Sequence, residues 1–239
     1  MVLLAFINAS GSAVVLPKIK FMSFDEAFFY IGIGNFYWLI SMLFAFLGMC
    51  IGIISITNER SNGSLRVLMT KPIYRRDVVI GKIFGISSLL FALISFTLIL
   101  FISLMMVTTS NSAPILELFL RVGIFDIILL INSIFTLSLV MLFGITLKKA
   151  EALVLSLGYI SFEWLSQTYL IPVWLGDLQI LNPMNLFVHA TSIHENDLFM
   201  ITIPFTTWLN NALPYILMLI VETLIIILLN CILFNREEM

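Results

Sequence analysis

From Ile83 to Leu116 the chain reads IFGISSLLFALISFTLILFISLMMVTTSNSAPIL and contains no charged residue. A helix needs about 20 consecutive apolar residues to cross the hydrocarbon core of a membrane, so this run is long enough to span it. The whole chain shares this character, since 61% of its 239 residues are hydrophobic and only 11% are charged. Soluble domains hold roughly 45–50% apolar and about 25% charged residues. The sequence therefore predicts an all-α integral membrane protein.

Further runs of spanning length are predicted on both sides of this one. They are Ala27–Asn58, Ile127–Leu147, Ala152–Trp174 and Asn211–Phe234. The third of these is interrupted only by Glu163 and the fourth only by Glu222. The N-terminal run Met1–Leu16 is apolar but short, and we expect it to be a truncated or unusual first span. A cleaved signal peptide is the alternative, but no basic segment precedes the apolar part.

Together these runs predict a polytopic helical protein of about six spans, forming one transmembrane domain over residues 1–239. Most of the twelve basic residues lie in the loop 58–82, in the turn that holds Lys148 and Lys149, or after the last span at Arg236. Basic loops stay on the cytoplasmic side, so we expect a multi-pass protein of the cytoplasmic membrane with these segments inside. The outer stretch 175–210 is expected to hold an interfacial or re-entrant helix from Leu198 to Thr207.

The loop between the second and third spans reads NERSNGSLRVLMTKPIYRRDVVIGK over residues 58–82. Leu65, Leu68 and Met69 fall on one face at helical spacing. Pro72 disfavours helical geometry at Lys71 and ends the element. The residues by themselves predict a short amphipathic helix at the inner membrane surface, which an ordinary positive-inside loop would also explain.

This loop resembles the pattern ER-x-x-G-[ST]-L-x-x-L-x-x-x-P-x-x-R-x-x-x-x-x-G-K of the ABC-2 type transporter permease family. The residues in register are Glu59, Arg60, Gly63, Ser64, Leu65, Leu68, Pro72, Arg75, Gly81 and Lys82. The resemblance implies a permease subunit of an ATP-binding-cassette exporter, a transport subunit that is not itself an enzyme. It also implies that the loop, with Met69 on its apolar face, is a coupling helix that docks on the ATPase.

The resemblance also implies partners. They are a separate ABC ATPase subunit that binds ATP and Mg²⁺, a second permease chain that is identical or related, and membrane lipid, with no nucleic acid. The 239 residues hold no GxxxxGK[ST] phosphate loop, because Gly81-Lys82 lacks the upstream glycine and the following Ser or Thr. No cofactor is therefore expected in this chain. An accessory membrane scaffold, or an ATP-independent secondary transporter or channel, is the alternative, although no inverted repeat is visible.

Two acidic residues lie inside predicted spans, Glu163 and Glu222. Counting from Lys149 and Arg236, both lie about 21 Å into the membrane at 1.5 Å per residue. Ionisable residues there are costly, so one interpretation is a polar translocation path and the other is helix packing or protonation. Asn132, Ser133 and Thr136 are expected to serve helix packing. His189 and His194 are expected to be solvated loop residues, not a metal site.

Overall fold

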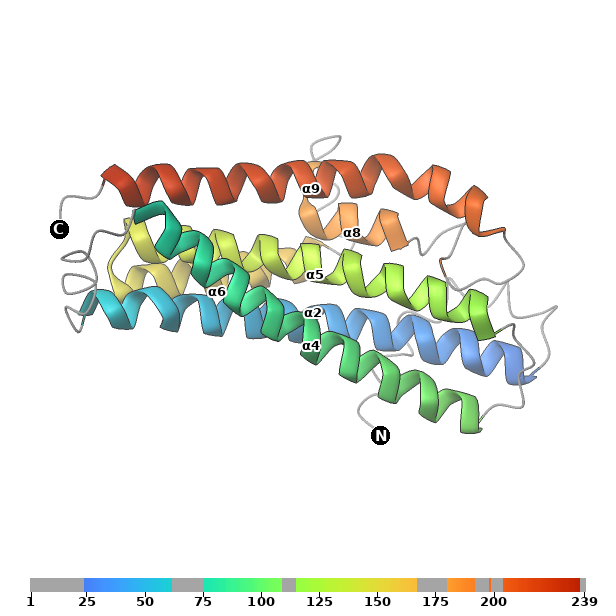
Figure 1. Cartoon of the computed structure of the whole chain (residues 1–239). Helices are drawn as coiled ribbons and strands as arrows, with labels where there is room; N and C mark the ends of the chain where they lie inside the picture. Colours follow the sequence, from blue (N-terminus) through green and yellow to red (C-terminus); the bar gives the residue numbers. More distant parts are fainter. Residues whose placement is uncertain are drawn as a thin grey trace.

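The computed structural model describes residues 24–61, 75–108, 115–166, 180–191, 198 and 204–236. In these residues it has the helices α2 (Phe24–Ser61), α4 (Arg75–Thr108), α5 (Ile115–Thr146), α6 (Lys149–Ser166), α8 (Pro183–Thr191) and α9 (Phe205–Arg236). The helices α2, α4, α5 and α9 run along the bundle, while α6 and α8 are shorter (Figure 1). The predicted all-α polytopic architecture is confirmed.

The long helices contain the runs that the sequence predicts to cross a membrane. Stretches long and apolar enough to span are Leu39–Thr57, Arg76–Ser103, Glu117–Thr146 and Phe205–Asn235. The helix α6 covers the first part of the predicted run Ala152–Trp174, and the remainder of that run lies outside the described residues, as does Met1–Leu16. The helix α9 begins earlier than predicted, so Phe205 to Thr207 form its first turn and do not belong to a separate outer helix.

The basic segments of the chain gather at one end of the bundle. The C-terminal end of α2, the start of α4, the turn from α5 to α6 and the end of α9 all lie together at the left of Figure 1. Simple crossing by each long helix predicts this arrangement, because successive helices then alternate in direction. The short connection between Thr146 and Lys149 makes α5 and α6 antiparallel neighbours.

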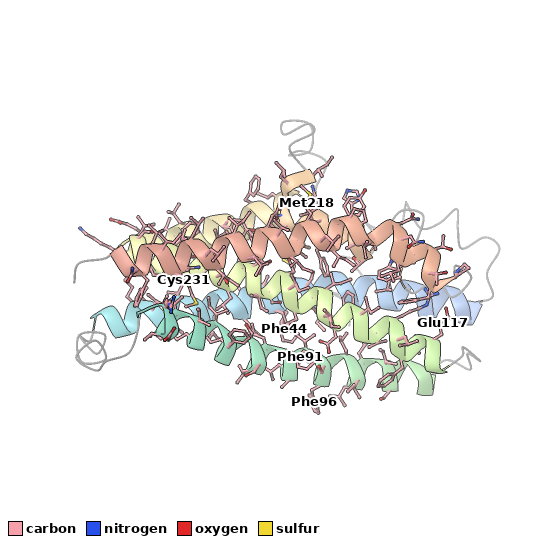
Figure 2. All side chains as sticks on the ribbon, turned by 45° about the horizontal axis from the view of Figure 1, so that its top comes forward. Phe44, Phe91, Phe96, Glu117, Met218 and Cys231 are labelled. Atoms are coloured by element: carbon pink, nitrogen blue, oxygen red, sulfur yellow. The ribbon has the colours of Figure 1, made fainter. Side chains whose placement is uncertain are left out.

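The helix α5 occupies the centre of the bundle, since each of the other five helices packs against it. Of its apolar stretch 61% is buried, against 28% for α4 and 17% for α9. Side chains follow the same division: Phe44 of α2 points into the bundle and Phe96 of α4 points away from it (Figure 2). The outer faces of α4 and α9 are therefore left for lipid or another apolar surface.

Glycines allow α2 to approach α5 closely. A Cβ atom at Gly48 would lie 3.3 Å from the carbonyl oxygen of Ser133, and one at Gly52 would lie 3.0 Å from Leu137 Cδ1. Both separations are tighter than ordinary van der Waals contact. Small residues are common at such crossings, because helices within lipid associate through close packing of their backbones.

The helix α8 is a buried element that the sequence analysis did not anticipate. Asn182 accepts a hydrogen bond from the backbone N–H of Met184 at 3.3 Å, and Pro183 occupies the first helical position, where its missing N–H costs nothing. The ring of Phe187 lies 6.0 Å from that of Phe125 in α5. His189, expected in a solvated loop, is instead in this helix and stacks on Tyr215 of α9, with ring centroids 5.2 Å apart.

Arg121 joins α5 to the outer part of the chain. Its guanidinium group is completely buried and contacts the carboxylate of Glu117 at 2.6 Å. Arg121 Nη1 also donates to the carbonyl of Leu198, whose own N–H donates to the carbonyl of Thr191 at the end of α8. A buried arginine is stable only when its donors are paired, so this network fixes residue 198 and α8 against α5.

We expect Gly52→Leu to lower the thermal stability of the protein, because the new side chain would also meet the carbonyl oxygen of Leu137, 3.3 Å from its Cβ. Overpacking of this kind costs roughly 1–3 kcal/mol. The measurement is thermal unfolding in lipid nanodiscs, followed by intrinsic fluorescence. Gly85→Leu is the matched control, since no atom of the described residues packs within 4 Å of a Cβ there. Equal losses in both variants would contradict the close packing of α2 on α5.

Candidate functional site

The residues predicted to couple the protein to an ATPase surround the connection between α2 and α4. Glu59 and Arg60 lie in the last turn of α2, Arg75 is the first residue of α4, and Gly81 and Lys82 lie two turns into α4. The loop positions between these helices fall outside the described residues. They are Gly63, Ser64, Leu65, Leu68, Met69 and Pro72. The structure thus describes the two helices that hold the predicted coupling helix.

Lys82 links these two helices near the end of the bundle that carries the loop. Its Nζ donates to the carbonyl oxygen of Ser55 in α2, with a separation of 2.9 Å. A hydrogen bond from an ammonium group is stronger than one between neutral groups. By contrast, the pair between Arg76 and Asp77 is largely exposed and contributes little to stability. A displacement of the loop would therefore reach α2 and α4 together.

Gly81 has no packing partner within the described residues. No atom lies within 4 Å of a Cβ added there, and the residue is exposed. Packing among the described residues therefore does not explain the glycine, whereas the predicted coupling pattern includes it.

The second group of predicted residues lies within the bundle, on α6 and α9. The carboxylate of Glu163 is buried, with 3% of the residue exposed, and it accepts a hydrogen bond from the hydroxyl of Tyr159 one turn earlier on α6. The ring of Tyr159 in turn lies 6.5 Å from that of Phe135 on α5. These contacts direct the polar face of α6 towards the central helix.

Glu222 approaches the same tyrosine from α9. One carboxylate oxygen, Oε2, is buried and has no hydrogen-bond partner among the described residues. The carboxylate interacts electrostatically with Tyr159 across the bundle. Asn230 fixes the position of α9 along the axis of α5, because its side-chain amide donates to the carbonyl of Ser138 at 2.7 Å. The structure thus relates both Glu163 and Glu222, predicted at similar depths, to Tyr159, the first by a hydrogen bond and the second electrostatically.

Several buried hydroxyl groups elsewhere in the core donate to carbonyls of their own helices. Ser133 donates to the carbonyl of Leu129 at 2.9 Å, and Thr136 donates to that of Asn132 at 3.2 Å. Such bonds remove the cost of carrying a hydroxyl into an apolar interior. The helix-packing role of Asn132, Ser133 and Thr136 stays a prediction. The side-chain oxygen and nitrogen of Asn132 are buried without a hydrogen-bond partner in the part of the chain described.

Sequence reasoning missed Tyr159, and it missed where Asn132 would lie. Tyr159 precedes Glu163 by four residues, a spacing at which two side chains meet on a helix surface. The contact between them could therefore have been predicted from the sequence. The position of Asn132 opposite α6 depends on how the two helices are aligned, and only the structure supplies that alignment. For metal binding, no group of three or more His, Cys, Asp or Glu side chains comes together in the described ranges.

The bundle and its site define a class of protein, a polytopic helical membrane protein with apolar outer faces and polar side chains directed inwards. Residues 8–239 match the family model described as ABC-2 family transporter protein, and the chain belongs to this family. A search of curated proteins gave no match to the chain. The family membership makes the chain a permease component of an ABC-type transporter, a membrane transport subunit with several spans.

We expect Tyr159→Phe to destabilise the protein, because it removes the hydroxyl that donates to the buried carboxylate of Glu163. Leaving a buried acceptor without its partner costs about 1–3 kcal/mol. The change is measured as a lower midpoint of thermal unfolding in nanodiscs. Tyr215→Phe is the matched control, since it keeps the ring that stacks on His189. A Tyr159→Phe protein as stable as the control would contradict the role of this hydrogen bond.

Proposed function

We propose that this chain is the membrane-spanning permease of an exporter in the cytoplasmic membrane, driven by ATP hydrolysis in a separate ABC ATPase subunit. The observation that carries the proposal is the match of residues 8–239 to the ABC-2 transporter family. The proposal is supported by the lack of a phosphate-binding loop in the 239 residues, so that ATP and Mg²⁺ would bind to the partner. A second permease chain, identical or related, would complete the transporter.

In the proposed mechanism, the loop after α2 docks on the ATPase. The apolar face formed by Leu65, Leu68 and Met69 would enter a groove on that subunit, a common way for a short amphipathic helix to bind. Closure of the ATPase would then push the loop. The bond from Lys82 to Ser55 would pass this movement to α2 and α4 together, and α5 would carry it to the interior of the bundle.

The polar interior is the proposed path for the substrate. Glu163 and Glu222 both interact with Tyr159. They lie at a depth where a charged side chain facing lipid is costly. In this mechanism a change in the spacing of α6 and α9 around α5 would open or close access to these side chains. The export direction is tested by loading inside-out and right-side-out vesicles and comparing ATP-driven movement of the cargo.

We expect Leu68→Asp to abolish both co-purification with the ATPase and stimulation of its activity, since a charge would enter the apolar groove. The measurements are pull-down of the ATPase and its turnover in nanodiscs, with size-exclusion chromatography to check that the permease is folded and inserted. Thr70→Asp is the matched control, because it adds the same charge off the apolar face. Normal coupling in Leu68→Asp would refute the docking role.

We expect Lys82→Met to leave docking on the ATPase intact and to impair the transmission of movement from the loop to α2 and α4. The ATPase should still co-purify, because the apolar face proposed to dock (Leu65, Leu68 and Met69) is unchanged, but stimulated turnover should fall several-fold as the bond between α4 and α2 is lost. Lys148→Met removes an exposed charge at the same end of the bundle and should leave turnover unchanged. Transport that persists without the ATPase would instead favour a secondary transporter or channel, and a protein that neither transports nor stimulates would favour a scaffold.

A further inference from the structure

Asn132 stands out among the buried polar residues of the bundle. Its residue surface is 1% exposed, and neither its side-chain oxygen nor its nitrogen has a hydrogen-bond partner among the described residues. Its neighbours Ser133 and Thr136 bond to carbonyls of their own helix, which an asparagine amide here does not do. A buried amide with both ends unpaired is costly, and in a native protein it commonly marks the place of a water, an ion or a ligand group.

The alignment of α5 and α6 places Asn132 opposite Glu163. At 1.5 Å per residue, Asn132 lies about 21 Å before the end of α5 at Thr146, and Glu163 lies about 21 Å after the start of α6 at Lys149. The contact between Phe135 and Tyr159 confirms this alignment one turn closer to the connecting turn. Residues three and four apart share a helix face, so Asn132 faces α6 as Phe135 does, and Glu163 faces α5 as Tyr159 does.

A third helix contributes to the same layer. Glu222 of α9 interacts with Tyr159, and its buried Oε2 has no partner in the described part of the chain. Measured from the bond between Asn230 and Ser138, Glu222 lies about 12 Å farther out along α9 and Asn132 about 9 Å farther out along α5. Acceptor oxygens from α5, α6 and α9 therefore lie within a few ångströms of the same depth.

The chemistry of these groups restricts what they bind. Two carboxylates repel an anion, and an apolar occupant would leave the amide and the carboxylate oxygens unsatisfied. A small cation satisfies them, since oxygen atoms from carboxylates, amides and phenols are ligands for hard metal ions and acceptors for N–H donors. The amide N–H of Asn132 would then donate to a carboxylate or to a water carried with the cation.

We propose that Asn132, Glu163 and Glu222, with Tyr159 between the two acids, form a binding site for a small monovalent cationic group inside the bundle. The group is either an alkali metal ion or the protonated amine of a cargo molecule. The inference deepens the proposed translocation role of the two acids and rests on it. Its test uses the permease alone, so a failure of the cation site is distinguishable from a failure of coupling to an ATPase.

The test is thermal unfolding of the full chain in nanodiscs with sodium, potassium, ammonium or methylammonium chloride, at an ionic strength held constant with tetramethylammonium chloride. A ligand present at 100 times its Kd should raise the midpoint by about 5 °C or more. A rise with sodium or potassium alone identifies a metal ion, and a rise with ammonium and methylammonium alone identifies an amine. Either result supports the site, whereas no rise with any of these cations overturns it.

Variants assign the effect to these residues. Asn132→Leu and Glu163→Gln should each lose the rise, while Asp126→Asn should keep it, because Asp126 is a buried acid that bonds to Ser95 of α4 elsewhere in the bundle. A rise that survives in both site variants overturns the proposal. If Asn132→Leu does not fold, equilibrium binding of radiolabelled sodium, rubidium or methylammonium to the unaltered protein decides, with saturable binding of one cation per chain expected and its absence contradicting the site.

Discussion

The helix α5 crosses the bundle with an arginine, an aspartate and an asparagine among its residues, and it does so only because five other helices enclose it. Lipid offers no hydrogen bonds, so each of these polar groups must be hydrogen-bonded within the protein or to a bound ligand. Arg121 is paired with Glu117 and with the outer stretch, and Asp126 with Ser95. The outer stretch at Leu198 meets this need for Arg121, and α4 meets it for Asp126.

The packing around α5 is uneven, and this bears on how the protein would change shape. The helix α2 packs closely against α5, because glycines bring the two backbones together. By contrast, α4 and α9 expose most of their apolar stretches. The short helix α8 packs against both α5 and α9, where the ring of Phe187 is tilted against that of Phe125 and His189 stacks on Tyr215. A movement that begins at the loop after α2 would therefore pass more easily through α4 than through the contact of α2 with α5.

Much of this architecture could be predicted from the sequence, because spans within lipid must be long, apolar and free of charge. The runs Ile83–Leu116 and Ile127–Leu147 meet these conditions. The described part of the first is helical, and the second is helical as far as Thr146. The helix α8 escaped prediction because nine residues are too few to show a period, although Asn182 followed by Pro183 is a readable start signal. The equal depth of Glu163 and Glu222 followed from counting, but the presence of Asn132 opposite α6 required the helix alignment. The residues of the predicted coupling helix, such as Leu68, remain a prediction.

The close packing of α2 against α5 has a practical consequence for experiments that follow conformational change in this protein. Gly48 and Gly52 lie against the backbone of α5, so sliding would bring the two backbones into steric clash and separation would lose their close packing. Spectroscopic labels placed on the lipid-facing sides of α2 and α5 would thus report a nearly constant separation through a working cycle. The distance between these two labels would serve as an internal reference. Changes in the distances from these labels to α4 and α9 would be compared with it.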